Sequence, residues 1–514
     1  MKVLIILEYL TNLMILLFYY MHMFQLNSYF LKKQMHWIKE NSKKIILQIS
    51  IVILATILFI FSNVICNILG IIILGISILY NIPKGKAKVA FKITNRVKRM
   101  FVTEVVLILI VLIINYKNYI ILKLCALNVL APIICVIANF INYPIEDMIR
   151  KHYINDAKKI LKNMPDLIII GITGSYGKTS VKNFLEKTLE KKYEVLVTPK
   201  NYNTTMGVVK TIRENLKPIH QVFICEMGAT KPNDIKEICD IVHPKFGIIT
   251  SIGPQHLESF KSIENIIKTK FELADSVKEN NGMIFINYDN EYLSKQNINQ
   301  EYTTYGINNN NLDFNAFNIS SSSQGSSFSM FDKNSNKEIE FKTKLIGTHN
   351  VINIAGAIAV SNVLGIPLID IVPQVKKLQN VEHRLQLIAN GNLNIIDDSY
   401  NSNPVSSKSA IDTLAQFEGT KIIVTPGLIE LGENEEKYNS ELGKYAANIC
   451  DYIFLVNSKQ AKYILQGISS TNYDNEKIYN VNSPNEAIKK ILNLGINDKI
   501  TVLLENDLPD NYNV

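Results

Sequence analysis

The stretch Gly171-Ile-Thr-Gly-Ser-Tyr-Gly-Lys-Thr-Ser180 decides the fold of this 514-residue chain. It follows the apolar run 167–170 (Leu-Ile-Ile-Ile), which is typical of a buried parallel strand, and precedes residues 181–189, whose spacing predicts a helix. Strand, glycine-rich turn and helix together predict a phosphate-binding loop. Glycines let backbone N–H groups point at phosphate oxygens, and the start of a helix favours negative charge.

The turn and the start of the helix supply the groups expected to hold nucleotide phosphates. Lys178 can reach the β- and γ-phosphates, and the Thr179 hydroxyl can ligate Mg²⁺. The strict pattern GxxxxGK[ST] is not met, because Ile172 stands where its first glycine belongs. The flanking strand and helix nevertheless favour nucleotide phosphate over a chance Gly-Lys-Thr. The predicted nucleotide-binding residues of this stretch are Gly174, Ser175, Gly177, Lys178, Thr179 and Ser180.

Residues 1–143 differ in composition from the remainder of the chain. They are dominated by Ile, Leu, Val, Phe and Tyr, whereas the remainder has the pattern of a soluble α/β protein. At about 20 residues per crossing, this region has room for about five α-helical membrane spans. The first apolar run lacks a small-residue cleavage site, so we interpret it as a retained span and not a signal peptide. The predicted spans are residues 3–24, 45–63, 65–80, 101–115 and 119–140.

Positive charge is concentrated in two loops between the apolar runs, residues 25–44 and 81–100. The positive-inside rule places both loops in the cytoplasm, so five spans deliver residue 144 onward to the cytoplasm as well. The sequence thus predicts a multi-pass protein of the cell membrane whose basic loops contact membrane lipid. Topology explains much of the net charge of +8, so we expect no nucleic-acid partner. Six cysteines without a CxxC motif favour reduced, cytosolic domains.

Charged candidates follow two further predicted strands. The strand over 222–226 ends in Glu226, and a carboxylate at the C-terminal edge of a sheet suits a hard cation between phosphates. The strand over 246–250 leads to His256, and a predicted helix over 267–273 carries Lys270. Taken alone, these residues have ordinary interpretations as a surface carboxylate, a structural histidine and a solvated lysine.

A change in composition at 379–383 marks a domain boundary. We predict a central α/β domain with a parallel sheet over 144–380 and a C-terminal α/β domain over 381–514. The alternation of helices and strands up to residue 505 suits a dinucleotide-fold-like, or Rossmann-like, C-terminal domain. The central domain also contains a helix that begins near 347, whose first polar residues would ordinarily cap it. These residues are His349, Asn350 and Asn353.

Together these motifs resemble the Mur ligases, the enzymes that add amino acids to bacterial cell-wall peptides. The turn matches the family's TGSxGKT, residues 226–229 match its EMGA, and residues 347–353 match its GxHNxxN. The most specific match is Asp397-Asp-Ser-Tyr-Asn-Ser-Asn-Pro404, which resembles the family's DDSYNANP. The resemblance extends from the turn almost to the C-terminus. It is closest to the subgroup that joins D-Ala-D-Ala to a muramyl tripeptide.

The resemblance implies ATP and two Mg²⁺ ions as cofactors, with a role for each matching residue. The implied metal ligands are Thr179, Glu226, His256 and Lys270, a lysine that the family carbamylates. The implied catalytic residues are Lys178, His256, Lys270 and the hinge residue Arg384. The further implied nucleotide-binding residues are Asn287, His349, Asn350, Asn353, Arg384 and Asp398. The implied substrate-facing residues are Asn201, Asn203, Tyr400, Asn401 and Asn403.

Three segments depart from the family pattern. The predicted spans stand where the family has a soluble domain that grips the UDP-sugar. Residues 504–510 (Leu-Glu-Asn-Asp-Leu-Pro-Asp) replace the late KGSR-type stretch that helps hold the amino-acid substrate. Residues 425–433 resemble GDMxELG but lack its Asp. The resemblance therefore supports the ATP chemistry better than the identity of the substrates.

The resemblance implies an ATP-dependent ligase that forms an amide bond through an acyl phosphate. Its expected substrates are a muramyl-peptide or lipid-linked wall precursor and an amino-acid or dipeptide amine. One alternative is a membrane amide ligase of the poly-γ-glutamate type, which also pairs such a core with membrane attachment. Another is a non-catalytic nucleotide-binding scaffold of the wall-assembly machinery. The oligomeric state stays open.

Overall fold

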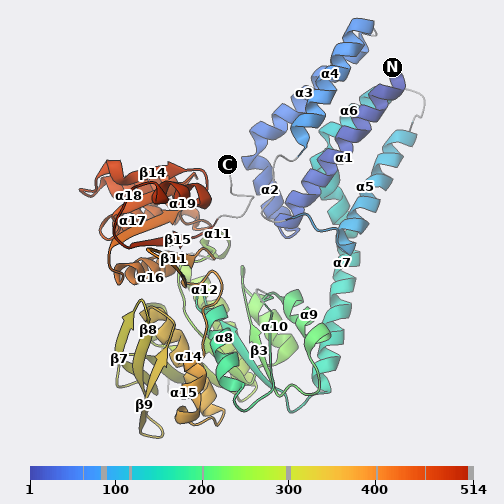
Figure 1. Ribbon diagram of the computed structural model, residues 1–514. Helices are drawn as coiled ribbons and strands as arrows, with labels where there is room; N and C mark the ends of the chain where they lie inside the picture. Colours follow the sequence, from blue (N-terminus) through green and yellow to red (C-terminus); the bar gives the residue numbers. More distant parts are fainter. Residues whose placement is uncertain are drawn as a thin grey trace. The chain divides into compact units, whose positions relative to one another are not determined.

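The structure, a computed structural model, forms two compact units, residues 1–152 and residues 153–507. The first unit is helical, and the second contains two β-sheets covered by helices (Figure 1). The residues that the structure describes are 1–61, 63–82, 90–114, 119–199, 202–296, 302–400, 403–457 and 459–507.

The first unit is built from long apolar helices. Its described helices are α1 (Lys2–Leu26), α2 (Leu31–Glu40), α3 (Ser42–Ile60), α4 (Val64–Asn81), α5 (Asn95–Ile113), α6 (Ile120–Val129) and α7 (Ala131–Lys162), which continues past the unit boundary. Within the described residues, four of them, α1, α3, α4 and α7, are long and apolar enough to cross a membrane.

The two remaining predicted spans differ from the structure. Residues 119–140 do not form one helix, because α6 ends at Val129 and α7 begins at Ala131. The span predicted over 101–115 falls in α5, which begins at Asn95 and is not among the four candidate helices. The first turns of α5 carry Arg96, Lys98 and Arg99, so a window of membrane-spanning length takes in too many charges.

A buried set of polar side chains joins four helices of the first unit. The Asn12 Nδ2 donates to Asn128 Oδ1 at 3.0 Å, and the Asn12 Oδ1 accepts from Asn81 Nδ2 at 3.0 Å. Gln48 Nε2 donates to Asn81 Oδ1 at 2.8 Å, and the Tyr20 hydroxyl donates to Gln48 Oε1 at 3.0 Å. All five side chains are buried. These bonds connect α1, α3, α4 and α6 through their interior.

The larger sheet of the second unit has nine strands in the order β2-β3-β1-β4-β5-β6-β7-β8-β9. The strands from β2 to β7 run parallel, as predicted, but β8 and β9 are antiparallel. A short turn between β7 and β8 leaves no room for a crossover helix, so the chain reverses direction. The strands are β1 (Ile168–Thr173), β2 (Val195–Val197), β3 (Val222–Glu226), β4 (Phe246–Ile249), β5 (Met283–Asn287), β6 (Tyr302–Ile307), β7 (Phe314–Ser322), β8 (Gly325–Asp332) and β9 (Lys337–Thr343).

Helices cover both faces of this sheet, so its central strands are apolar on both sides. Along β1, Ile170 and Ile172 pack toward one core, and Ile169 packs toward the other. The first core is closed by α8 (Lys178–Leu189), α14 (Thr348–Val363) and α15 (Leu368–Lys376). The second is closed by α9 (Thr205–Asn215), α10 (Asp234–Val242) and α12 (Ile263–Glu279).

The smaller sheet has six strands in the order β10-β11-β15-β12-β13-β14, all parallel except β10. Its strands are β10 (Gln386–Asn390), β11 (Leu393–Asp398), β12 (Thr420–Thr425), β13 (Tyr452–Val456), β14 (Ile478–Val481) and β15 (Ile500–Glu505). Its principal helices are α16 (Pro404–Ala415), α17 (Glu435–Ala447), α18 (Ala461–Ser469) and α19 (Pro484–Leu492). This is the α/β arrangement expected for the C-terminal part.

Candidate functional site

The predicted phosphate loop connects β1 to α8, and two of its glycines are required by the backbone. Gly174 has φ 154° and Gly177 has φ 82°. A Cβ at Gly174 would lie 2.0 Å from the Thr250 hydroxyl oxygen, and one at Gly177 would lie 2.8 Å from Asn353 Oδ1. The turn is held in place from outside, because the Ser175 N–H donates to the Ser251 carbonyl at 2.8 Å. It therefore wraps closely around the start of α8.

The Lys178 side chain folds back onto the backbone of this turn. Its Nζ donates to the carbonyls of Gly174 at 2.6 Å and Ser175 at 3.2 Å. Burial, together with the charge of Arg384, lowers the pKa of the Lys178 amine to about 8, although Glu226 acts in the opposite direction. The amine is thus held where a phosphate oxygen would replace the carbonyls as its partner.

This pKa predicts that nucleotide binding takes up a proton above pH 8. Phosphate oxygens favour the charged amine, so the pKa of Lys178 should rise on binding. Affinity for ADP should then fall by about tenfold per pH unit above pH 8, and stay unaffected by this group below pH 8. Isothermal titration calorimetry in buffers of different ionisation enthalpy measures the proton uptake. Uptake that persists in Lys178→Met would contradict the assignment.

Glu226 ends β3 beside the turn and is the centre of a polar cluster. Its Oε1 accepts hydrogen bonds from Thr179 Oγ1 at 3.2 Å and from Asn203 Nδ2 at 3.0 Å. The Lys182 Nζ lies 3.0 Å from its other oxygen, Oε2. Burial alone would raise the pKa of this carboxyl, but Lys182, Lys178 and the Asn203 hydrogen bond hold it below its ordinary value. The group is therefore a carboxylate at neutral pH.

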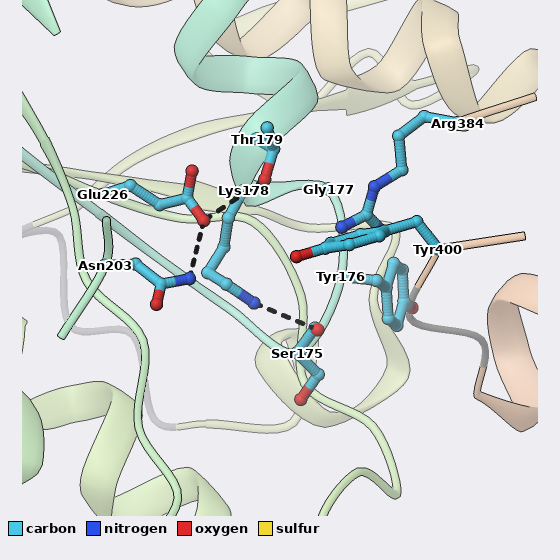
Figure 2. Close-up of a pocket in the computed structure, with 9 residues that line it drawn as sticks. All are labelled: Ser175, Tyr176, Gly177, Lys178, Thr179, Asn203, Glu226, Arg384 and Tyr400. Atoms are coloured by element: carbon cyan, nitrogen blue, oxygen red, sulfur yellow. Dashed lines mark hydrogen bonds between the residues drawn. The ribbon is translucent and has the colours of Figure 1, made fainter. Parts of the chain in front are cut away.

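Side chains from the C-terminal part complete this pocket (Figure 2). Arg384 lies over the Tyr400 ring, with 4.8 Å between the guanidinium carbon and the ring centroid. Burial lowers the pKa of Arg384, and Asp398, Glu226 and Tyr400 oppose that shift. The residues that line the pocket are Ser175, Tyr176, Gly177, Lys178, Thr179, Asn203, Glu226, Arg384 and Tyr400.

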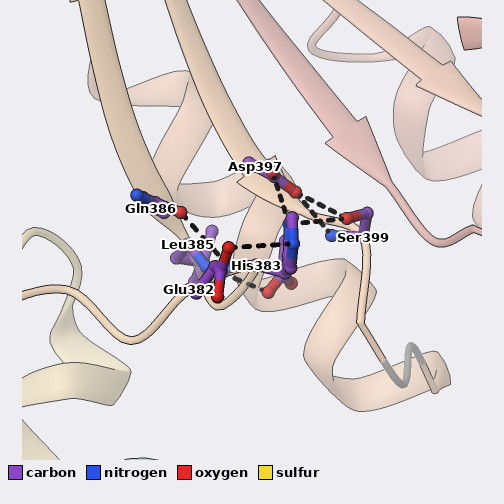
Figure 3. Close-up of polar contacts among 7 residues, drawn as sticks. Glu382, His383, Leu385, Gln386, Asp397 and Ser399 are labelled. Carbon is purple, nitrogen blue, oxygen red and sulfur yellow. Dashed lines mark hydrogen bonds and ion pairs between the residues drawn. The ribbon is translucent and has the colours of Figure 1, made fainter.

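A tight polar turn contains the residues on either side of Arg384, and Figure 3 shows their polar contacts. These residues, His383 and Leu385, both adopt positive φ, 59° and 44°. The His383 Nδ1 lies 2.8 Å from Asp397 Oδ2, and the Leu385 N–H donates to Asp398 Oδ1 at 3.1 Å. These bonds hold a backbone conformation that branched or bulky side chains rarely adopt. The sequence did not single out His383 or Asp397 for this role.

The donors around Glu226 fit a magnesium ion. Thr179 and Glu226 offer a hydroxyl and a carboxylate oxygen on the phosphate side of the turn, and Mg²⁺ prefers such hard ligands. No cluster of three or more His, Cys, Asp or Glu side chains occurs among the described residues. This donor set matches an ion that takes one or two protein ligands and completes its shell with phosphate and water.

The other two predicted metal ligands lie differently. Lys270 on α12 is buried, and burial together with the charge of Lys178 holds its pKa well below the ordinary value of lysine. This direction of shift favours the neutral amine that carbamylation requires, and carbamylation of Lys270 stays a prediction. His256 does not line the pocket; its Nδ1 contacts the Glu430 carboxylate across the interface with the C-terminal part. Its metal-binding role stays a prediction.

The residues predicted to lie near adenine and ribose have different surroundings in the structure. Asn353 lies against Gly177 of the turn, and Asn287 donates to the Thr250 carbonyl at 2.9 Å beside it. Asn350 instead donates to the Ile346 carbonyl at 2.8 Å, and no side chain caps the N-terminus of α14, so the capping interpretation of these residues is not met. Burial lowers the pKa of His349 to about 4, so it is neutral. Burial raises the pKa of Asp398 to about 6, against the effect of Arg384.

Of the predicted substrate-facing residues, Asn203 and Tyr400 line the pocket. Asn403 does not: it caps α16, and its Oδ1 accepts from the backbone N–H of Val405 at 3.0 Å and Ser406 at 3.1 Å. Its Nδ2 is buried without a partner among the described residues. Asn201 and Asn401 lie outside the described residues.

Both α/β parts of the chain match domains of a known protein family. The Mur ligase middle domain matches residues 172–361, and the Mur ligase glutamate ligase domain matches residues 383–505. The UDP-N-acetylmuramoyl-tripeptide--D-alanyl-D-alanine ligase of Buchnera aphidicola is 32% identical over 350 residues, 67% of this chain and 73% of that enzyme. The Bacillus subtilis enzyme of the same name is 32% identical over 280 residues, 54% of this chain and 59% of its own.

Solved structures agree. MurF from Acinetobacter baumannii superposes with a TM-score of 0.63 and 26% identity, covering 70% of this chain and 77% of its own. MurF from Thermotoga maritima in complex with ADP gives 0.61 and 25%, covering 70% and 80%. The two matched Mur ligase domains and the named relatives define the class of protein, an ATP-dependent ligase. The chain belongs to the Mur ligase family, and it acts in cell-wall peptide synthesis.

Proposed function

We propose that this chain joins D-Ala-D-Ala, or a related amine, to the carboxylate of a muramyl peptide at the expense of ATP. The observation that carries the proposal is the pocket in which Lys178, Thr179 and Glu226 of the central part face Arg384 of the C-terminal part. Two cationic groups and a hydroxyl–carboxylate pair around a phosphate loop suit phosphoryl transfer. The names of the relatives above supply the substrate class.

In the first step a carboxylate oxygen of the peptide attacks the γ-phosphorus of ATP, and the bond to the bridging oxygen of ADP breaks. The products are an acyl phosphate and ADP. Lys178 and Arg384 would offset the negative charge that accumulates on the transferred group and on the leaving oxygen. Mg²⁺, held by Thr179 and Glu226, would neutralise the phosphates when bound.

In the second step the amine attacks the acyl carbon, inorganic phosphate leaves, and the ammonium that forms loses a proton. A cavity of about 700 Å³ adjoins the pocket and shares Thr179, Arg384 and Tyr400 with it. We assign this cavity to the reacting ends of the two substrates, because it opens where the transferred phosphoryl group would lie. Holding both ends beside the loop would supply the entropic advantage of an intramolecular reaction.

We also propose that the helical unit anchors the ligase in the cell membrane, in place of the family's UDP-binding domain, with the α/β parts in the cytoplasm. Four helices of sufficient length and apolar character support this proposal, as do the basic residues at the N-terminus of α5. Extraction of the full chain from membranes by carbonate would contradict the anchoring.

The test of catalysis uses the full-length protein in detergent with ATP and two substrate sets. We expect ADP release that requires both UDP-muramyl-tripeptide and D-Ala-D-Ala, with mass spectrometry showing the amide product. ADP release with glutamate alone would instead show a poly-γ-glutamate type of ligase. If neither substrate set supports ATP turnover, the cell-wall substrate class has no support. Nucleotide binding without any turnover would favour the scaffold hypothesis.

A further inference from the structure

Lys182 is a buried lysine on α8 that sequence analysis did not single out. It lies one helical turn after Lys178, yet only 1% of it is exposed. Its Nζ donates to the Thr198 carbonyl at 2.9 Å and lies 3.0 Å from Glu226 Oε2. The lysine thus connects three elements: the phosphate-loop helix, the end of β2 and the strand that carries Glu226.

The two oxygens of Glu226 have different surroundings. Oε2 faces Lys182 in the interior, whereas Oε1 accepts from Thr179 and Asn203 at the pocket. An ion pair at one oxygen restricts rotation of the carboxylate about the Cγ–Cδ bond. The direction of the other oxygen is therefore restricted as well. The Thr198 carbonyl accepts a hydrogen bond from Nζ and so fixes the position of Nζ as well.

A contribution to folding stability does not by itself explain the buried Lys182–Glu226 ion pair. Removing two charges from water costs about as much as their attraction returns, and well-packed apolar side chains of similar size often serve equally well. Lys178 and Thr179 already occupy the phosphate side of the same helix. Lys182 does not line the phosphate pocket. It borders the adjoining cavity, but its Nζ is engaged by the Thr198 carbonyl and by Glu226 Oε2, so it adds little as a further phosphate ligand.

We propose that Lys182 is a positioning residue, which orients the Glu226 carboxylate so that Oε1 and the Thr179 hydroxyl together receive the divalent cation that accompanies the nucleotide. The inference rests on the proposed function, because it requires a nucleotide–magnesium complex at this loop. Partners that orient metal ligands typically change metal affinity by about 10- to 100-fold when they are removed.

The test measures how strongly Mg²⁺ improves nucleotide binding by the full-length protein in detergent. The Kd of a fluorescent ADP analogue is measured once in the presence of Mg²⁺ and once in the presence of EDTA. The Kd in EDTA divided by the Kd in Mg²⁺ is the ratio that is compared among variants. Lys182→Met should lower this ratio by about tenfold or more while the Kd in EDTA stays within about threefold of wild type. Lys191→Met, which removes an exposed lysine just beyond α8, should leave both values unchanged.

Two further variants separate positioning from folding. Lys182→Met removes the cation nearest to the buried Glu226 and should lower the midpoint of thermal unfolding. The double variant Lys182→Met/Glu226→Gln removes both charges, so the midpoint should recover while the magnesium effect stays lost. Lys182→Arg, which keeps the charge, should restore part of the ratio.

The outcomes are distinguishable. A wild-type protein whose ADP affinity does not respond to Mg²⁺ would overturn the proposed function and this inference with it. A wild type that responds, with Lys182→Met responding equally, would overturn the inference alone. Recovery of the magnesium effect together with stability in the double variant would also overturn it, because the carboxylate would then not matter to the cation.

Discussion

Replacing Lys178 by alanine is expected to lower ATP turnover by about 10²- to 10³-fold, the usual effect of removing one charged or hydrogen-bonding group from a transition state. The amine sits inside the turn on the carbonyls of Gly174 and Ser175, so it is already at the phosphate position before nucleotide arrives. ADP release with saturating substrates measures the loss. Nucleotide affinity should fall as well, because the γ-phosphate loses a cation in the ground state.

A matched control removes a lysine of similar sequence position but no role in the pocket. Lys191→Ala takes away an exposed charge near the end of the same helix and should retain full turnover. Equal turnover in Lys178→Ala and Lys191→Ala would show that the turn does not hold the reacting phosphate. The substitution at Lys178 leaves both positive-φ glycines in place, so the loop backbone itself should persist.

Replacing Arg384 by alanine is expected to cost about 10³-fold in turnover, the lower end of what an arginine at a transferring phosphoryl group contributes. Its guanidinium lies on Tyr400 and faces Glu226 and Lys178 across the pocket. Because Arg384 belongs to the C-terminal part, we expect the loss in the chemical step more than in ADP binding. Single-turnover phosphate transfer, measured beside the Kd for ADP, resolves the two.

The geometry of Arg384 also predicts a graded series. Arg384→Lys keeps the charge but loses the planar fork and the stacking on Tyr400, so turnover should be intermediate between wild type and alanine. Lys376→Ala, an exposed lysine at the end of α15, is the control and should be unaffected. A lysine variant with full turnover would mean that only the positive charge matters at this position.

The parallel core of the fold could be predicted because its signals are local. The run 167–170, the glycine turn and the helix after it are adjacent in sequence, and the structure has β1 and α8 there. The antiparallel strands β8 and β9 were missed, because a strand that pairs through a hairpin looks in isolation like one that follows a crossover. The break at Leu130 was missed because the apolar run continues across it, and Pro132 was not taken as a signal. Proline fits the first turn of a helix, and here it lies in the first turn of α7.

The candidate site was predictable where a residue's type reveals its chemistry, and less so where its surroundings do. Glu226 and Lys178 could be named from strand-end and loop position, and the structure brings them together. Lys182 is an unremarkable helix lysine in sequence, and only its burial against Glu226 sets it apart. Asn403 appeared as a substrate contact through family resemblance, although an Asn-Pro pair before a helix is also a capping signal.

The buried amide side chains of the helical unit have a consequence for how its helices assemble. Asn12 is shared by partners on α4 and α6. If the unit spans the membrane as proposed, a helix that entered the bilayer alone would carry unpaired amide groups into hydrocarbon. Their pairing is complete only when α1, α3, α4 and α6 have gathered. Under the proposal that this unit is a membrane anchor, we expect the four helices to insert together, because each depends on the others to pair its amides. Loss of one amide should then destabilise the association of all four.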